Sequence, residues 1–226
     1  MKKLLALLPL IGAFALAGCG GEKEEENSGG DHLDYNEEQV KQKVRTLGET
    51  SGYEISFVVK SSDSEDDSYT IGAKNHFYWG YNDDSKSMYH LENDMVQTYR
   101  YDSESGMFEK YGEEYSIAGT DYEENFRVGY DLYLCMGSTH AESGGLTKVK
   151  ETTFLGRQAT EYKLSYGSVY GSASYELIVD KETGITLKWA VSGTSYVDGE
   201  SGAASFEVTS FKTGDDVVVP SIKAEA

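Results

Sequence analysis

The residue types best suited to nucleophilic chemistry in this 226-residue sequence are Cys135 and His140, five positions apart. A cysteine becomes a nucleophile when a neighbouring imidazole takes its proton. Cys135 lies between the apolar Leu134 and Met136, however, which favours a buried structural thiol. The signatures of serine hydrolases, zinc peptidases, penicillin-binding enzymes and phosphate-binding loops are missing from the sequence. We therefore expect a protein that is not an enzyme.

Metal binding is the second chemistry that the residue types suggest. His76 and His90 flank the turn at Asp83-Asp84 almost symmetrically, so they can lie close together across a hairpin. A metal site normally needs three or four ligands, so surface histidines are the simpler interpretation. Clusters of carboxylates also recur in four loops, at residues 63–68, 82–85, 102–106 and 198–202. None has the ligand spacing of a calcium loop, so we expect solvated turns, no metal and no cofactor.

The N-terminus carries a different kind of reactive cysteine. Lys2 and Lys3 precede an uncharged run over residues 4–17, which is too short to span a membrane and has the length of a secretory signal. The run ends in Leu-Ala-Gly-Cys at residues 16–19, which resembles the lipobox of bacterial lipoproteins. The resemblance implies a signal peptide over residues 1–18 and a diacylglycerol on Cys19.

Residues 19–33 follow as a segment rich in glycine and glutamate, which predicts a flexible acidic tether. We expect the protein to be anchored on the extracytoplasmic face of a bacterial membrane. The acidic, proline-poor and tyrosine-rich composition favours a cell membrane over an outer membrane. The net charge of −19 makes nucleic acid an improbable partner, because phosphates would be repelled.

The elements that would form the domain span residues 34–219, with a tail at 220–226. Residues 34–47 predict a helix capped by Asp34 and Glu37, with an apolar stripe at Val40, Val44 and Leu47 that ends at Gly48. A second helix is predicted over residues 120–136. The remaining segments predict strands, and over residues 161–209 apolar and polar side chains alternate with a period of two.

The resulting fold class is α+β, mostly β. It is a curved antiparallel sheet of about ten strands, an open half-barrel with two helices on its concave side. The turn of residues 180–184 joins two strands, and Gly184 is placed to adopt a positive φ.

This order of elements resembles the LolA/LolB-like superfamily of lipoprotein and lipid carriers. The hairpin "YELIVDKETGITLKW" at residues 175–189 is similar to a hairpin of that family, and "FEVTSFKTGDDV" at 206–217 resembles its closing strand. The resemblance implies an open half-barrel whose concave face holds acyl chains or another apolar ligand.

Six aromatic residues are the candidate ligand-binding set, because aromatics on the inner face of a curved sheet can line an apolar pocket. They are Phe77, Trp79, Tyr81, Tyr162, Tyr166 and Trp189. The alternative is that they pack the core against the helices. We therefore expect a monomer that binds or carries a lipid or acyl chain without catalysis. The alternative is an envelope interaction or sensory module with a filled core.

Overall fold

The computed structural model of the chain describes residues 33–62, 64–82, 84–118, 146–169, 171–195, 197, 199 and 201–224. Cys19, the signal and most of the tether lie outside the described residues, as do the expected helix at 120–136 and the pair Cys135 and His140. Among the described helices, none is long and apolar enough to cross a membrane.

The N-cap of helix α2 (Glu37–Thr50) lies two residues later than expected. Asn36, not Asp34, is the N-cap: its side chain accepts from the Gln39 N–H at 2.9 Å, and the Gln39 side chain accepts from the Asn36 N–H at 2.9 Å. The helix also passes Gly48 and stops only before Gly52, whose φ is +82°. The predicted apolar stripe is confirmed at Val40 and Val44, which are fully buried.

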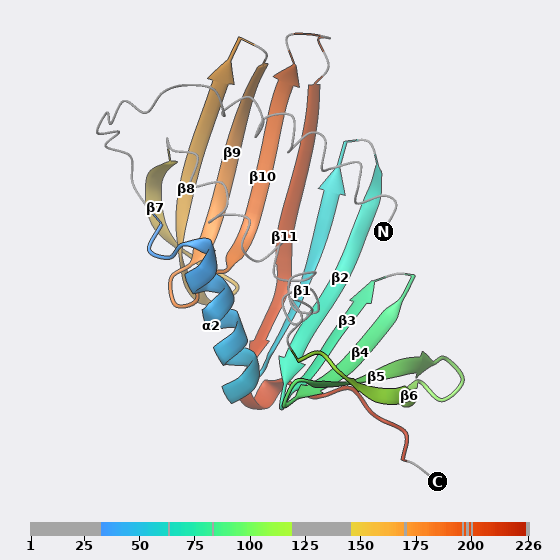
Figure 1. The fold of residues 1–226 in the computed structure, drawn as a ribbon. Coiled ribbons are helices and arrows are strands. Elements are labelled where there is room, and N and C mark those ends of the chain that lie inside the picture. The colour runs from blue at the N-terminus through green and yellow to red at the C-terminus, as the bar shows by residue number, and fades with distance from the viewer. Residues whose placement is uncertain are drawn as a thin grey trace.

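Eleven antiparallel strands form one sheet in the order β6-β5-β4-β3-β2-β1-β11-β10-β9-β8-β7. The strands are β1 (Tyr53–Ser61), β2 (Ser64–Lys74), β3 (Phe77–Asn82), β4 (Lys86–Glu92), β5 (Met95–Asp102), β6 (Met107–Ser116), β7 (Leu146–Phe154), β8 (Arg157–Ser168), β9 (Gly171–Asp180), β10 (Thr186–Ser195) and β11 (Ser201–Thr213). The sheet is curved and open, with β6 and β7 as its edges (Figure 1). The expected open half-barrel of mostly β structure is confirmed. Its sheet has eleven strands among the described residues, where about ten were expected.

The sheet has two unlike faces, because successive side chains of a strand point to opposite sides. We call the side on which α2 lies the α2 face. It carries the main apolar core, which extends over nearly the whole sheet. In register across it lie Phe206 of β11, Trp189 of β10, Leu177 of β9 and Tyr162 of β8.

The opposite face is polar over β7–β11. Cross-strand ion pairs join Lys163 to Glu176 at 3.2 Å and Lys188 to Glu207 at 2.6 Å. The sequence alternation assigned Lys163, Lys188 and Glu207 to solvent, and that prediction is confirmed at these positions. It is wrong at Thr186, which is fully buried, because the register shifts between Thr186 and Lys188.

The chain ends by crossing the opposite face over the N-terminal strands. After the 3-10 helix η3 (Gly214–Asp216), residues 217–223 form an extended segment that we call the strap. Ser221 and Lys223, which the sequence assigned to a tail, hydrogen-bond to the backbone of Phe108 in β6 at 2.8 and 2.7 Å. The strap is the red segment that runs to the C-terminus beside β3–β6 in Figure 1.

Candidate functional site

The six candidate aromatics do not share one face of the sheet. Tyr162 and Trp189 lie on the α2 face and are 3% and 2% exposed. Phe77, Trp79 and Tyr81 alternate along β3 toward the opposite face, where they belong to a separate cluster. The backbone of Tyr166 pairs with Ala173 of β9, and its side chain lies outside the description. The set therefore divides into two groups that cannot line a single pocket.

The α2 face offers a continuous apolar and aromatic surface. The rings of Tyr175 and Trp189 lie 6.2 Å apart, and Phe57 lies 4.9 Å from Phe206 and 5.2 Å from Tyr69. Burial raises the pKa of the Tyr175 hydroxyl above its ordinary value, which keeps it uncharged. The side chains described on this surface are mainly apolar or aromatic and are buried.

Helix α2 is attached to one end of this surface. Gly48 lies so close to β2 that a Cβ added there would be 2.9 Å from the Cβ of Ala73. Near the other end of the helix, Lys43 donates to the carbonyl of Glu182 at 3.0 Å. A Cβ added at Gly184 would meet Val40 at 2.8 Å, and the predicted positive φ of Gly184 is confirmed at +76°. The helix thus rests on the β9–β10 turn and on the end of β2.

A buried ion pair fixes the turn on which α2 rests. Arg157 Nε donates to Asp180 Oδ2 at 2.7 Å, and Thr183 donates to Asp180 through its backbone N–H at 2.8 Å and its hydroxyl at 2.7 Å. Burial alone would raise the pKa of Asp180, but the hydrogen bonds from Arg157 and Thr183 outweigh it and leave that pKa lowered. The Arg157 guanidinium also lies 4.4 Å from the ring of Phe211. The turn is therefore a rigid platform for the helix.

On the opposite face, the strap covers the second aromatic group. Trp79, Met88, Phe108 and Val217 are each no more than 2% exposed and pack together. The indole of Trp79 lies over Gly72, where a Cβ would be 2.2 Å from the ring. The sequence reasoning missed this cluster. The signal that could have found it is the apolar run at residues 217–219, which follows two aspartates at the end of the last strand.

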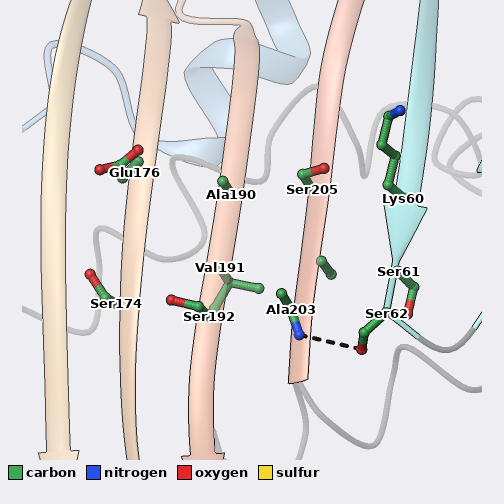
Figure 2. Close-up of a pocket in the computed structure, with 11 residues that line it drawn as sticks. Lys60, Ser61, Ser62, Ser174, Glu176, Ala190, Val191, Ser192, Ala203 and Ser205 are labelled. Carbon is green, nitrogen blue, oxygen red and sulfur yellow. Dashed lines mark hydrogen bonds between the residues drawn. The ribbon is translucent and has the colours of Figure 1, made fainter. Parts of the chain in front are cut away.

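The hollows found among the described residues lie elsewhere. Figure 2 shows an open trough over β9, β10, β11 and the end of β1. Its lining mixes serines, such as Ser174, with small apolar residues and two charged side chains, Lys60 and Glu176, and the Ala203 N–H donates to Ser62 at its rim at 3.4 Å. An adjoining hollow is lined by serines, glycines and Ala173 and Ala203, among others. Neither contains a candidate aromatic of the described set.

The histidine pair is close, with ring centroids of His76 and His90 6.3 Å apart. Within the described ranges, no cluster of three or more His, Cys, Asp or Glu side chains is arranged to hold a metal ion. The two histidines thus lie close together, as the sequence predicted. Within the described ranges they are not joined by the further ligands that a metal site needs.

No protein-family model matches the sequence, and no curated protein matches it. Solved structures do. MucB in complex with MucA(peri) is 12% identical over 78% of this chain with a TM-score of 0.32, and the chain spans 55% of MucB. LprF from Mycobacterium bovis is 10% identical over 81% of this chain and 95% of LprF, with a TM-score of 0.34. A LolA-superfamily protein from Nitrosomonas europaea is 7% identical over 79% of this chain and 93% of its own length, with a TM-score of 0.23.

Proposed function

We propose that this protein binds an apolar ligand of the acyl-chain class on the α2 face, without catalysis, and that α2 is the gate. The observation that carries the proposal is how little of α2 is buried. Val40 and Val44 are its only large apolar side chains that are fully buried, while Leu47 is half-buried. The buried apolar core below extends much farther than the helix, to Val191 and Tyr175 on β10 and β9.

The energies agree with a movable helix. Full burial of a valine contributes about 1.5–3 kcal/mol, so lifting both valines of α2 costs roughly 3–6 kcal/mol. The polar contact between Lys43 and Glu182 is exposed and adds little. An acyl chain that enters gains about 0.8 kcal/mol for each buried methylene, so about four to eight methylenes offset the opening.

Anchoring is part of the same proposal. A lipid on Cys19 would hold the domain on the extracytoplasmic side of a membrane, where acyl chains are available. Replacement Cys19→Ser should move the protein from the membrane fraction to the soluble fraction and abolish labelling by radioactive palmitate. Retention of both properties in Cys19→Ser would contradict the anchor.

The ligand is tested by locking the gate. In a Cys19→Ser, Cys135→Ser background, the pair Gly48→Cys and Ala73→Cys are the only thiols, since the sequence has two cysteines. The separation of 2.9 Å between the built Cβ atoms is slightly below the usual disulfide span of about 3.5–4.5 Å, which a small shift of α2 restores. Native mass spectrometry should detect a bound fatty acid in the reduced protein and none when the oxidised protein is exposed to it.

The same protein before and after reduction is the matched control, because the two samples differ by one bond. Equal lipid uptake in both would remove α2 as the gate. A ligand-free mass in both would instead support the second candidate, an interaction module. That candidate is favoured by one observation: Trp189, Leu177 and Phe206 already fill the α2 face, each no more than 2% exposed.

A further inference from the structure

The groove beneath the strap is formed by β3–β6 on the face opposite α2. Its floor is Trp79, Met88 and Phe108, and its sides are completed by half-buried aromatic residues. Tyr101 packs edge-on against Phe108, with 5.4 Å between the ring centroids, and the Lys86 ammonium lies 4.0 Å from the centre of the Tyr101 ring. The strap therefore closes over an aromatic cluster that reaches the edge of the sheet at β6.

The strap occupies this channel as a peptide ligand would. Val217 is 2% exposed, Val218 is 73% exposed, and Val219 again packs against the cluster, which is the alternation of an extended strand. Farther along, the Phe108 N–H donates to Ser221 and the Phe108 carbonyl accepts from Lys223, as in strand addition to a sheet edge.

The strap fits the groove incompletely. The indole N–H of Trp79 is buried and has no acceptor among the described residues. Such a group costs about 1–3 kcal/mol, which an occupant with a suitably placed carbonyl would recover. At its start the strap is held by Lys74 Nζ, which donates to the carbonyls of Gly214 and Val217 at 2.9 and 2.8 Å. The strap is also held by Val217 and Val219, by its bonds to the Phe108 backbone and by the ion pair of Lys223 with Asp102 at 3.9 Å.

We propose that this groove is a docking site for an extended peptide segment of a partner protein, and that the strap is its occupant within the chain. The segment would carry two β-branched apolar residues two positions apart, which take the places of Val217 and Val219. About four residues after the first of them, its backbone would hydrogen-bond to Phe108 as the strap does. The N–H and carbonyl of Phe108, which the strap now satisfies, require both an acceptor and a donor, which a polypeptide supplies and an acyl chain does not. The site is separate from the α2 face and does not depend on the function proposed above.

The test uses the full chain and a fluorescent peptide of residues 214–224. In the chain, Val217→Asp loosens the strap by placing a charge in the groove, whereas Val218→Asp makes the same change at an exposed position. Loss of one buried valine corresponds to about tenfold or more in binding, so Val217→Asp should bind the peptide about tenfold tighter than the unmodified chain. Val218→Asp should not differ from the unmodified chain, and a peptide with Asp at both groove positions should not bind.

Lys223→Pro keeps the experiment decisive if Val217→Asp fails to fold, because it removes the Lys223 N–H that donates to the Phe108 carbonyl and leaves the groove unchanged. It should strengthen peptide binding by a smaller factor, about threefold to tenfold. The proposal is overturned if a folded Lys223→Pro or Val217→Asp chain shows no saturable peptide binding. It is also overturned if palmitate, and not the peptide, occupies the groove of these variants.

Discussion

The two faces of the sheet are built from the same strands and are stabilised in different ways. The α2 face is one apolar core that extends from β5 to β7. The opposite face is polar over β7–β11, where ion pairs such as Lys163 with Glu176 face solvent, and apolar only where the strap crosses. The comparison shows that a covering segment, rather than strand propensity, decides which side of this sheet is buried.

Strands β10 and β3 differ in whether one or both of their faces are covered. In β10, Trp189 is buried on the α2 face and its neighbour Lys188 lies in an ion pair on the polar face. In β3, Tyr78 and Trp79 are both buried, at 8% and 1% exposure, because both of their faces are covered. We therefore expect substitutions on the two faces of β10 to cost different amounts of stability. Substitutions on the two faces of β3 should cost similar amounts.

The largest effect should come from the α2 face. Trp189→Ala removes a fully buried indole and should lower the free energy of unfolding by about 3–5 kcal/mol. Lys188→Ala, one position away on the exposed face, should change it by about 1 kcal/mol or less. Urea denaturation of both variants measures the difference, and equal losses would contradict the assignment of the two faces.

The platform beneath α2 should come next. Asp180→Ala leaves Arg157 without its buried partner and should cost about 3 kcal/mol or more, since the Asp180 side chain is 1% exposed. Asp84→Ala, in an exposed turn, is the matched control and should cost much less. Urea titrations at neutral pH compare them.

The pH dependence of the same pair follows from its lowered pKa. Because Asp180 has a lower pKa in the folded chain than in the unfolded chain, it stabilises the fold above about pH 4. That contribution is lost as the pH falls through the folded pKa. Asp180→Ala should therefore lose less stability than the unmodified chain between neutral and acidic pH, and parallel curves would contradict the role of the pair.

A smaller effect tests the strap side. Gly72→Ala places a methyl group 2.2 Å from the indole of Trp79 and should cost about 1–3 kcal/mol. In a Trp79→Leu background the same substitution should cost less, because the ring is gone. A double-mutant cycle by thermal unfolding measures the coupling, and strictly additive effects would show that the indole does not lie over Gly72.

The smallest effect should come from the exposed ion pairs. Lys163→Ala removes a cross-strand partner of Glu176 and should change the free energy of unfolding by about 1 kcal/mol or less. Added salt should reduce even this difference. A larger loss would mean that the polar face over β8 and β9 is covered rather than exposed.

Much of the fold could be predicted from the sequence where polar and apolar residues alternate. Over residues 161–209 most large apolar positions have a polar neighbour, so the faces of β8–β11 largely follow from a period of two. The run Phe77–Tyr81 offers no such contrast, because nearly every residue is aromatic. Its side chains were therefore grouped with those of Trp189, although register places Trp79 opposite Gly72 on the other face.

Two further features could not be predicted from local sequence patterns. Asp34 with Glu37 and Asn36 with Gln39 both satisfy the spacing of a capping box, and only the tertiary position of α2 selects Asn36. The strap follows a charged turn and contains Pro220, so it reads as the end of a domain. Its contacts with Phe108 lie more than a hundred positions away along the chain, which no local pattern encodes.

The most direct test of the central claim uses the two tryptophans, because Trp189 lies on the α2 face and Trp79 on the other. In Trp79→Phe and Trp189→Phe variants, one tryptophan emits at a time, and a stearate that carries a doxyl quencher reports which face it reaches. We predict saturable quenching of Trp189 and none of Trp79. Quenching of Trp79 alone, or of neither residue, would contradict an acyl-chain site on the α2 face.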